Sequence, residues 1–313
     1  MQRAAHQSGR PATPAGGPPR RAALGTGAGL LAAGLLASAT PPAAARSRTA
    51  RTPYAALRRL EHAHRARVGA FAHNTVTGAT VAYRAHARVP LCSVFKTLAV
   101  AAVLRDLARH GETPARLIRY TGADLVDNSP VTEQHVTTGM TVAGLCAAAL
   151  QRSDNTAANL LLRELGGPAA VTAFARSLGD RTTRLDRWEP DLNSAEPWRT
   201  TDTTSPAAIG TAYARLLVGD ALPPSDRGRL TAWMTANETS TNRFRAALDK
   251  DWTVADKTGT GSYGTGNDVG VAWTPDGTPI VLAVLTGKTE QAADADDPLI
   301  ASVTRVLAQA VTG

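Results

Sequence analysis

Cysteine and lysine are both scarce in this chain of 313 residues. The two cysteines, Cys92 and Cys146, stand in different apolar segments, and nothing in their spacing brings them together. We therefore expect two buried free thiols rather than a disulfide. The 34 basic residues include only four lysines, at positions 96, 250, 257 and 288. Because arginine is not deprotonated in proteins, these lysines are candidates for positions that need a titratable or compact cation.

Aromatic residues are also few, and they do not alternate with basic residues along any stripe. Phe, Trp and Tyr make up 4% of the chain, so we do not expect nucleic acid as a partner. The seven histidines show no metal-ligand spacing beyond His62-Ala63-His64, which lies in an arginine-rich segment. We therefore expect neither a bound metal nor a cofactor.

Acidic residues are absent from the first 45 positions, which carry four of the arginines and so contribute half of the net charge of +8. Arg20-Arg21 precedes the apolar stretch 22–39, and a small-residue site, Ala43-Ala44-Ala45, follows. This pattern predicts an export signal over residues 1–45, of the twin-arginine type. The mature protein would be secreted or periplasmic, without stable membrane association. An uncleaved membrane anchor is the alternative.

Strand patterns occur near both ends of the remaining chain, and helical patterns fill its middle. After a helix over 53–66, the expected strands are 68–73, 79–84, 252–260, 268–273 and 279–286, and a helix over 298–311 ends the chain. We predict an α+β fold in which residues 46–84 and 236–313 share one antiparallel sheet flanked by N- and C-terminal helices. Residues 85–235 would form an all-helical domain, including a helix-poor stretch over 184–206. A ligand site is expected between the two domains.

Ser93-Val94-Phe95-Lys96 opens a helical run that continues to His110. Ser93 and Lys96 are three residues apart, so both side chains fall on one helical face and can touch. A serine hydroxyl becomes a nucleophile when a neighbouring group takes its proton, and a lysine with a lowered pKa is able to do so. An ordinary helix cap followed by an ordinary helix lysine is the plainer interpretation.

Two further motifs carry the same kinds of side chain. Ser153-Asp154-Asn155 lies between two helical runs, where it is either a plain cap or a turn that points polar groups into a cleft. Lys257-Thr258-Gly259 ends a strand, and its glycine would let a ligand or a helix approach closely. The N–H group of Thr260 would then be free to bond a substrate carbonyl.

In this order, the three motifs resemble those of the penicillin-recognising serine enzymes. The segment Arg187-Trp188-Glu189-Pro190-Asp191-Leu192-Asn193 resembles the omega-loop signature of class A β-lactamases, and the resemblance extends over residues 53–312. It implies a β-lactamase/transpeptidase-like fold and the hydrolysis of a β-lactam ring through a serine acyl-enzyme.

The resemblance also implies roles for individual residues. Ser93 would be the nucleophile, and Lys96 and Glu189 would share the work of general base. Glu189 and Asn193 would hold the hydrolytic water. Ser153 would pass a proton to the leaving nitrogen. The side chains that bind substrate, or stand where relatives bind it, would be Asn128, Asn155, Arg243, Lys257, Thr258, Gly259 and Thr260.

Two of these positions depart from the pattern of many relatives. Asn128 occupies a place at the cleft rim that is often aromatic. Gly266 stands where some relatives supply an arginine for the substrate carboxylate, and Arg243 is the candidate substitute, with a solvated surface arginine as the alternative. The N–H groups of Ser93 and Thr260 would form the oxyanion hole. Relatives also suggest an ion pair between Arg187 and Asp202 and a cis peptide bond before Pro190.

Other functions remain to be weighed against hydrolysis. A D,D-peptidase of cell-wall synthesis uses the same three motifs but lacks Glu189 and its loop. A penicillin sensor stays acylated, and a structural protein would carry the motifs by coincidence. We expect a monomer that prefers penicillins to carbapenems.

Overall fold

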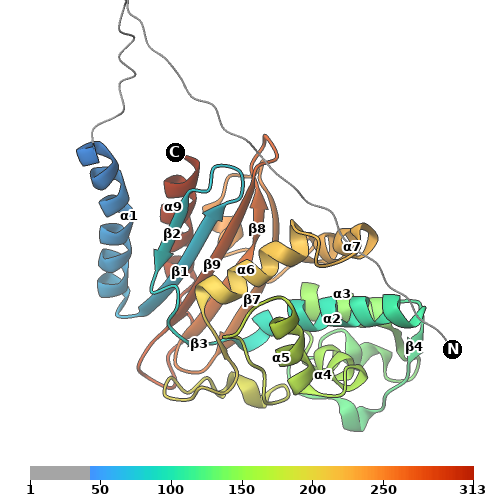
Figure 1. Ribbon diagram of the computed structural model, residues 1–313. Coiled ribbons are helices and arrows are strands. Elements are labelled where there is room, and N and C mark those ends of the chain that lie inside the picture. Colours follow the sequence, from blue (N-terminus) through green and yellow to red (C-terminus); the bar gives the residue numbers. More distant parts are fainter. Residues whose placement is uncertain (1–42) are drawn as a thin grey trace, which may run out of the picture. The chain divides into compact units, whose positions relative to one another are not determined.

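The computed structural model describes residues 43–313, which form one compact unit (Figure 1). The predicted export signal lies outside the described residues except for its last three positions. The helices are α1 (Ala43–His64), α2 (Phe95–His110), α3 (Val142–Gln151), α4 (Asn155–Glu164), α5 (Pro168–Ser177), α6 (Pro206–Leu217), α7 (Pro224–Thr235), α8 (Phe244–Ala247) and α9 (Asp297–Thr312). None of these helices is long and apolar enough to cross a membrane.

A five-stranded sheet has the order β2-β1-β9-β8-β7, and every neighbouring pair is antiparallel. Its strands are β1 (Arg67–Asn74), β2 (Thr80–Tyr83), β7 (Thr253–Gly261), β8 (Thr265–Trp273) and β9 (Pro279–Gly287). The prediction that both ends of the chain share one antiparallel sheet is confirmed, because β1 pairs with β9 along its whole length.

The sheet is covered on both faces, which explains why its central strand is apolar throughout. Ile280, Leu282 and Val284 of β9 pack in one core with residues of α1 and α9. The intervening Val281, Ala283 and Leu285 pack in a second core with residues of α2 to α7. Side chains alternate between the faces of a strand, so a strand buried on both faces has no polar alternation. Figure 1 shows α9 behind the sheet and α6 in front of it.

Two short strand pairs complete the helical part of the molecule. β4 (Leu117–Ile118) pairs with β5 (Met140–Thr141), and β3 (Val89–Pro90) pairs with β6 (Thr203–Thr204). Because β6 lies near the end of the helix-poor stretch, its pair with β3 fixes that end beside the segment that leads to Ser93. From 178 to 205 the chain contains one 3-10 turn, η4 (Asp191–Ser194), and no α-helix, as expected.

The first helix begins earlier than expected. The sequence predicted a helix over 53–66, whereas α1 begins at Ala43. Pro53 lies inside α1, where the pattern suggested a start, because a proline commonly marks the first turn of a helix. Both cysteines are buried free thiols, as expected. Burial raises the pKa of each of them.

Candidate active site

A cleft of about 350 Å³ lies where the three sequence motifs meet. It is lined by Ser93, Asn128, Arg152, Ser153, Asn155, Asn193, Thr239, Arg243, Thr258, Gly259 and Thr260. The structure therefore brings nine of the twelve predicted site residues to one surface. The other three, Lys96, Glu189 and Lys257, contact lining residues from behind.

Ser93 lies in the 3-10 turn η1 (Cys92–Val94) directly before α2, and not in the first turn of the helix as the sequence predicted. Cys92 has a φ of 44°, a left-handed conformation that favours glycine. Strained backbone of this kind is common at sites of chemistry. Here it stands directly before the candidate nucleophile.

Glycines in β7 allow this turn to approach the edge of the sheet. A Cβ on Gly261 would lie 2.8 Å from Cys92 Sγ, and one on Gly259 would lie 3.0 Å from Leu91 O. The expectation that glycine lets the strand and the neighbouring segment come close is therefore confirmed. The packing holds Ser93 against the strand that carries Lys257 and Thr258.

The hydroxyl of Ser93 donates a hydrogen bond to Glu189. Ser93 Oγ is 3.2 Å from Glu189 Oε1, and Glu189 Oε1 is also 3.1 Å from Lys96 Nζ. Although Ser93 and Lys96 are close in sequence, the described residues show no hydrogen bond between them. One carboxylate oxygen thus contacts both the candidate nucleophile and the candidate base.

Lys96 is completely buried, and its ammonium group has polar neighbours on several sides. Lys96 Nζ donates to Asn155 Oδ1 at 2.6 Å and to Ser153 O at 2.7 Å. Burial lowers the pKa of Lys96, and the Glu189 carboxylate opposes this effect. A lysine in this setting can exchange a proton with a neighbour more readily than an exposed lysine can.

Lys257 and Ser153 form the other end of the polar network. Lys257 Nζ donates to Ser153 Oγ at 3.0 Å and to Thr258 O at 2.8 Å. Burial, helped by the nearby Lys96 ammonium, lowers the pKa of Lys257 to about 7. Ser153 has a φ of 55°, so the serine between α3 and α4 is also held in a left-handed conformation.

The loop that carries Glu189 is fixed at several points, and one anchor was not identified from the sequence. Asn159 of α4 accepts from Glu189 N at 3.0 Å and donates to Glu189 O at 2.9 Å. Asn193 donates to the second carboxylate oxygen of Glu189. Asn159 lies one helical turn after Asn155, on the same face of α4. This spacing is the one sequence signal that could have identified it. The Glu189–Pro190 peptide bond is cis, as expected.

The predicted ion pair across the loop is present. Arg187 Nε is 2.6 Å from Asp202 Oδ2, and the Asp202 side chain is 1% exposed. Arg187 also donates to Ser194 Oγ at 2.8 Å. These contacts tie the start of the loop to its middle and its end.

Arg243 is buried, with 5% of its surface exposed, so it is not the solvated arginine of the alternative interpretation. Its guanidinium donates to Asp297 Oδ1 at 2.7 Å, to Asn267 O at 2.7 Å and to Thr260 Oγ1 at 2.9 Å. The Asp297 carboxylate balances the charge of the guanidinium. The hydrogen bond from the guanidinium to Thr260 Oγ1 can position Thr260 at the edge of the cleft.

Two of the remaining predicted residues bond within the protein. Asn155 Nδ2 donates to Asp127 O at 2.8 Å, while its Oδ1 accepts from Lys96. Asn128 has a φ of 60° and donates to Ser153 O at 3.3 Å. Asp154, the central residue of the second motif, caps α4 and is buried, so it has a structural role.

The sequence did not identify two residues that line the cleft, Arg152 and Thr239. Thr239 shares a hydrogen bond with Thr258. Arg152 adjoins Ser153 but belongs to no motif. A single arginine and a single threonine carry no local signal, and only the fold brings them to the cleft.

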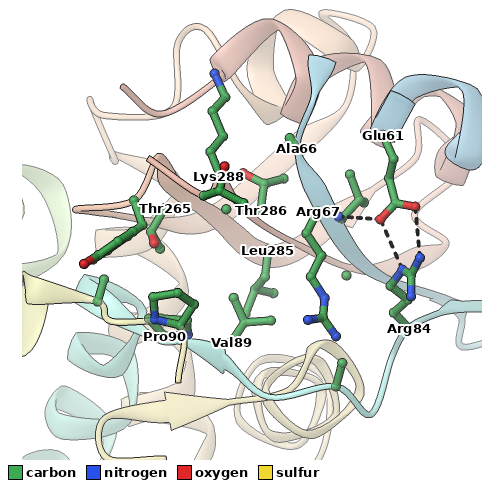
Figure 2. Close-up of a pocket in the computed structure, with 18 of the residues that line it drawn as sticks. Glu61, Ala66, Arg67, Arg84, Val89, Pro90, Thr265, Leu285, Thr286 and Lys288 are labelled. Carbon is green, nitrogen blue, oxygen red and sulfur yellow. Dashed lines mark hydrogen bonds and ion pairs between the residues drawn. The ribbon is translucent and has the colours of Figure 1, made fainter. Parts of the chain in front are cut away.

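A larger cavity, of about 870 Å³, lies at one end of the sheet (Figure 2). Figure 2 shows Arg67 pointing into the cavity between Val89 and the Glu61–Arg84 ion pair. Its lining contains no serine or cysteine, so it lacks the nucleophile that the smaller cleft presents. Within residues 43–313, no group of three or more His, Cys, Asp or Glu side chains could hold a metal ion.

Comparisons with known proteins agree with this geometry. Residues 52–311 match the model of the Beta-lactamase enzyme family. The chain is 59% identical over 300 residues to a β-lactamase of Streptomyces fradiae, covering 94% of this chain and 97% of that protein. It is 47% identical over 275 residues to the carbapenem-hydrolyzing β-lactamase KPC of Klebsiella oxytoca, covering 87% and 94%.

Solved structures place the fold in the same family. The β-lactamase from Streptomyces albus G superimposes with a TM-score of 0.81 at 60% identity, covering 82% of this chain and 98% of that one. The likeness spans both the sheet and the helices that surround the cleft. The chain therefore belongs to the β-lactamase enzyme family, as a class A serine β-lactamase that hydrolyses β-lactams.

Proposed function

We propose that the protein hydrolyses penicillins in preference to carbapenems, through an acyl-enzyme formed on Ser93. The observation that carries the site assignment is the contact of Glu189 Oε1 with both Ser93 Oγ, at 3.2 Å, and Lys96 Nζ, at 3.1 Å. This arrangement supplies a nucleophile within hydrogen-bond reach of a base that a third group orients.

In acylation, Ser93 Oγ attacks the carbonyl carbon of the β-lactam and loses its proton to the Glu189–Lys96 pair. Contact with both groups supports shared work as the base, because the proton moves within one hydrogen-bonded network. The amide nitrogen then leaves and takes up a proton from Ser153, which Lys257 and Lys96 replenish. The N–H groups of Ser93 and Thr260 receive the oxyanion, each worth about 3–4 kcal/mol at the transition state.

In deacylation, a water held by Glu189 and Asn193 attacks the ester on Ser93. Glu189 takes the proton of this water, and Ser93 leaves as a hydroxyl. The anchors on Glu189 support the role, because a base must be held within reach of the water it activates. Asn159 fixes the backbone of Glu189 through both its N–H and its carbonyl group.

The substrate carboxylate would lie at the opposite end of the cleft, against Lys257, Thr258 and Thr260. Arg243 supports this end by bonding Thr260 Oγ1. Gly259 lets the turn that carries Ser93 pack against this strand, because a Cβ there would lie 3.0 Å from Leu91 O. Asn155 and Asn128 would meet the side-chain amide on the other side of the reacting carbonyl. No cofactor takes part in this scheme.

Turnover of benzylpenicillin, with Glu189→Ala as the diagnostic variant, tests the assignment. Ring opening and intact protein mass are followed together in the purified protein. The parent should turn over rapidly, whereas Glu189→Ala should accumulate an adduct of the mass of the substrate, with turnover at least about a hundredfold lower, as for loss of a general base. Ser93→Ala should form no adduct.

Three outcomes would contradict the proposal. A stable adduct on the parent itself would indicate a sensor or a D,D-peptidase in place of a hydrolase. An adduct on Ser93→Ala would place the nucleophile elsewhere. Faster turnover of a carbapenem than of benzylpenicillin would overturn the proposed substrate preference. The two substrates need to be compared because one relative is named for carbapenem hydrolysis.

We further propose that the protein is exported as a folded monomer through the twin-arginine signal in residues 1–45. The support is the sequence pattern of Arg20-Arg21 and the apolar stretch after it. We also propose that the mature chain has an α/β domain, formed by residues 46–84 and 236–313, and a helical domain, formed by residues 85–235. The helical domain would include an omega loop over residues 184–206. Mass spectrometry of secreted protein and light scattering would test the cleavage site and the monomer.

A further inference from the structure

An ion pair closes the end of the cleft beside Ser153. Arg152 Nη1 is 3.3 Å from Glu238 Oε2, and Glu238 N donates to the carbonyl of Gln151 at 3.1 Å. Arg152 ends α3, whereas Glu238 follows α7 in the segment that leads back to the sheet. The pair therefore joins two walls of the cleft that are far apart in sequence.

Of the charged side chains in the cleft lining, that of Arg152 is the one that can turn toward a ligand. Only two charged residues line the cleft, Arg152 and Arg243. Arg243 is buried and held by an acidic partner and by backbone carbonyls. The side chains of Arg152 and Glu238 are 48% and 61% exposed. An exposed pair of this kind contributes little to stability, so either partner can reorient at small cost.

The place of the pair in the cleft identifies the part of the substrate that it faces. This step depends on the proposed function, in which Lys257 and Thr258 hold the substrate carboxylate and Ser153 lies at the leaving nitrogen. Thr239, the residue after Glu238, bonds Thr258 directly. Arg152 and Glu238 thus flank the carboxylate end, away from the side-chain amide. In a cephalosporin, the ring carbon next to the carboxylate-bearing carbon is C3, which carries a variable substituent.

We propose that Arg152 and Glu238 together determine how the enzyme responds to the charge of the C3 substituent of cephalosporins. The Arg152 guanidinium attracts anionic substituents, and the Glu238 carboxylate attracts cationic ones. With both present, their effects offset each other. Loss of one partner leaves the other unopposed at the cleft.

Arg152→Gln and Glu238→Gln test this with two pairs of substrates that differ only at C3. Cephaloridine carries a C3 pyridinium where cephalothin carries a neutral acetoxy group. Cefonicid carries a sulfonate on its C3 tetrazole where cefamandole carries only a methyl group. Each charged-to-neutral ratio of kcat/KM cancels general losses of activity.

The two variants should shift the ratios in opposite directions. Arg152→Gln should raise the cephaloridine ratio and lower the cefonicid ratio, by about three- to fivefold each, the size of one exposed charge contact. Glu238→Gln should do the reverse. The shifts should appear mainly in KM and shrink in 1 M NaCl, where the Debye length is about 3 Å. The swapped double variant Arg152→Glu/Glu238→Arg should return both ratios toward the parent.

Arg163→Gln is the matched control, because it breaks an exposed pair with Asp124, 2.9 Å apart, that does not line the cleft. Its ratios should equal those of the parent. Equal ratios in all variants, with benzylpenicillin still hydrolysed by the parent, would overturn this inference and leave the proposed function standing. Shifts of the same sign in both single variants would indicate a change of cleft shape and would also overturn it.

Discussion

Burial lowers the pKa of Lys257, and thereby sets the pH range in which this residue can hold the substrate carboxylate in the proposed function. The side chain is fully buried, and its pKa is lowered to about 7. A lysine holds a carboxylate only while it is protonated. The free enzyme therefore loses this cation as the pH rises through about 7.

We predict that kcat/KM for benzylpenicillin falls as the pH rises from 7 to 9, by about tenfold or more, as expected for a single group that must be protonated. The value of kcat should fall less, because a bound carboxylate favours the charged form of Lys257. Lys257→Arg should remove this alkaline decline, since arginine stays charged. Initial rates at substrate concentrations far below KM measure it.

Lys250→Arg provides the control, because Lys250 is exposed and does not line the cleft. It should reproduce the pH profile of the parent. A profile for Lys257→Arg that declines in parallel with the parent would assign the alkaline limb to another group, such as Lys96.

At the scale of elements, the loop that carries Glu189 depends on an ion pair whose acid is inaccessible to water. Asp202 accepts from the backbone N–H groups of residues 186 and 187 as well as from the Arg187 side chain. Removing the guanidinium would leave a carboxylate that is 1% exposed without its cation. Glu189, the proposed base, lies two residues after Arg187, so loss of the pair should also affect the chemistry.

Arg187→Ala should destabilise the protein by about 2 kcal/mol, below the usual cost of breaking a buried pair because Arg187 itself is partly exposed. The melting temperature should fall by about 4–8 °C. Deacylation should slow by about tenfold or more, since a small displacement of a base is costly. Thermal unfolding and the decay of the acyl-enzyme report the two effects separately.

Arg184→Ala is the control, because it removes an arginine from the same loop without breaking a buried ion pair. Arg184 pairs with Asp186, but the two side chains are 41% and 26% exposed. This variant should change melting temperature and deacylation little. If Arg187→Ala left both quantities unchanged as well, its structural role in the loop would be wrong.

Elements whose sequence pattern is local could be predicted, and those built by tertiary contact could not. The hairpin of β1 and β2 and the strand β9 follow alternation and apolar runs, so their limits agree with the structure to within one residue. β8 begins at Thr265 rather than at the expected Asp268, because Gly264 to Asn267 read as a turn. Pairing along β7 and β9 extends the strand over them.

The same distinction holds for the site. Motif residues can be identified in the sequence by their spacing, and the three motifs meet at one cleft as expected. The sequence indicated from helical periodicity that Ser93 and Lys96 can touch, and in the structure both side chains contact Glu189 Oε1, without a hydrogen bond to each other. Asn159, Arg152 and Thr239 reach the site through the packing of α3, α4 and the segment after α7, which no local pattern encodes.

For the whole molecule, two buried acids beside the cleft connect the free energy of unfolding to pH. Asp256 of β7 and Asp268 of β8 are both completely buried. Burial raises the pKa of both, and repulsion from Asp256 raises that of Asp268 further. Asp256 also accepts from Arg245, at 3.0 Å, and from Asn237, at 3.1 Å. Above the ordinary pKa of an aspartate, the pair therefore retains a proton in the folded state that is lost on unfolding.

The sign of the pH dependence follows from this proton. Above about pH 4, the ordinary pKa of an aspartate, the folded state binds one more proton than the unfolded state. The contribution of the pair to stability is thus fully present below about pH 4. It declines as the pH rises toward the raised pKa of Asp268, by at most about 1.4 kcal/mol per pH unit.

Asp268→Asn should remove this decline. The asparagine amide can donate to Asp256 as the protonated acid does, and its oxygen can still accept from Phe244 N. We predict that the variant gains stability relative to the parent as the pH rises from 5 to 9, with a net gain of about 1–2 kcal/mol at pH 8. Denaturant unfolding at several pH values measures the difference. Asp276→Asn, at a loop position, should run parallel to the parent over this range, and a parallel curve for Asp268→Asn would show that the buried pair holds no extra proton.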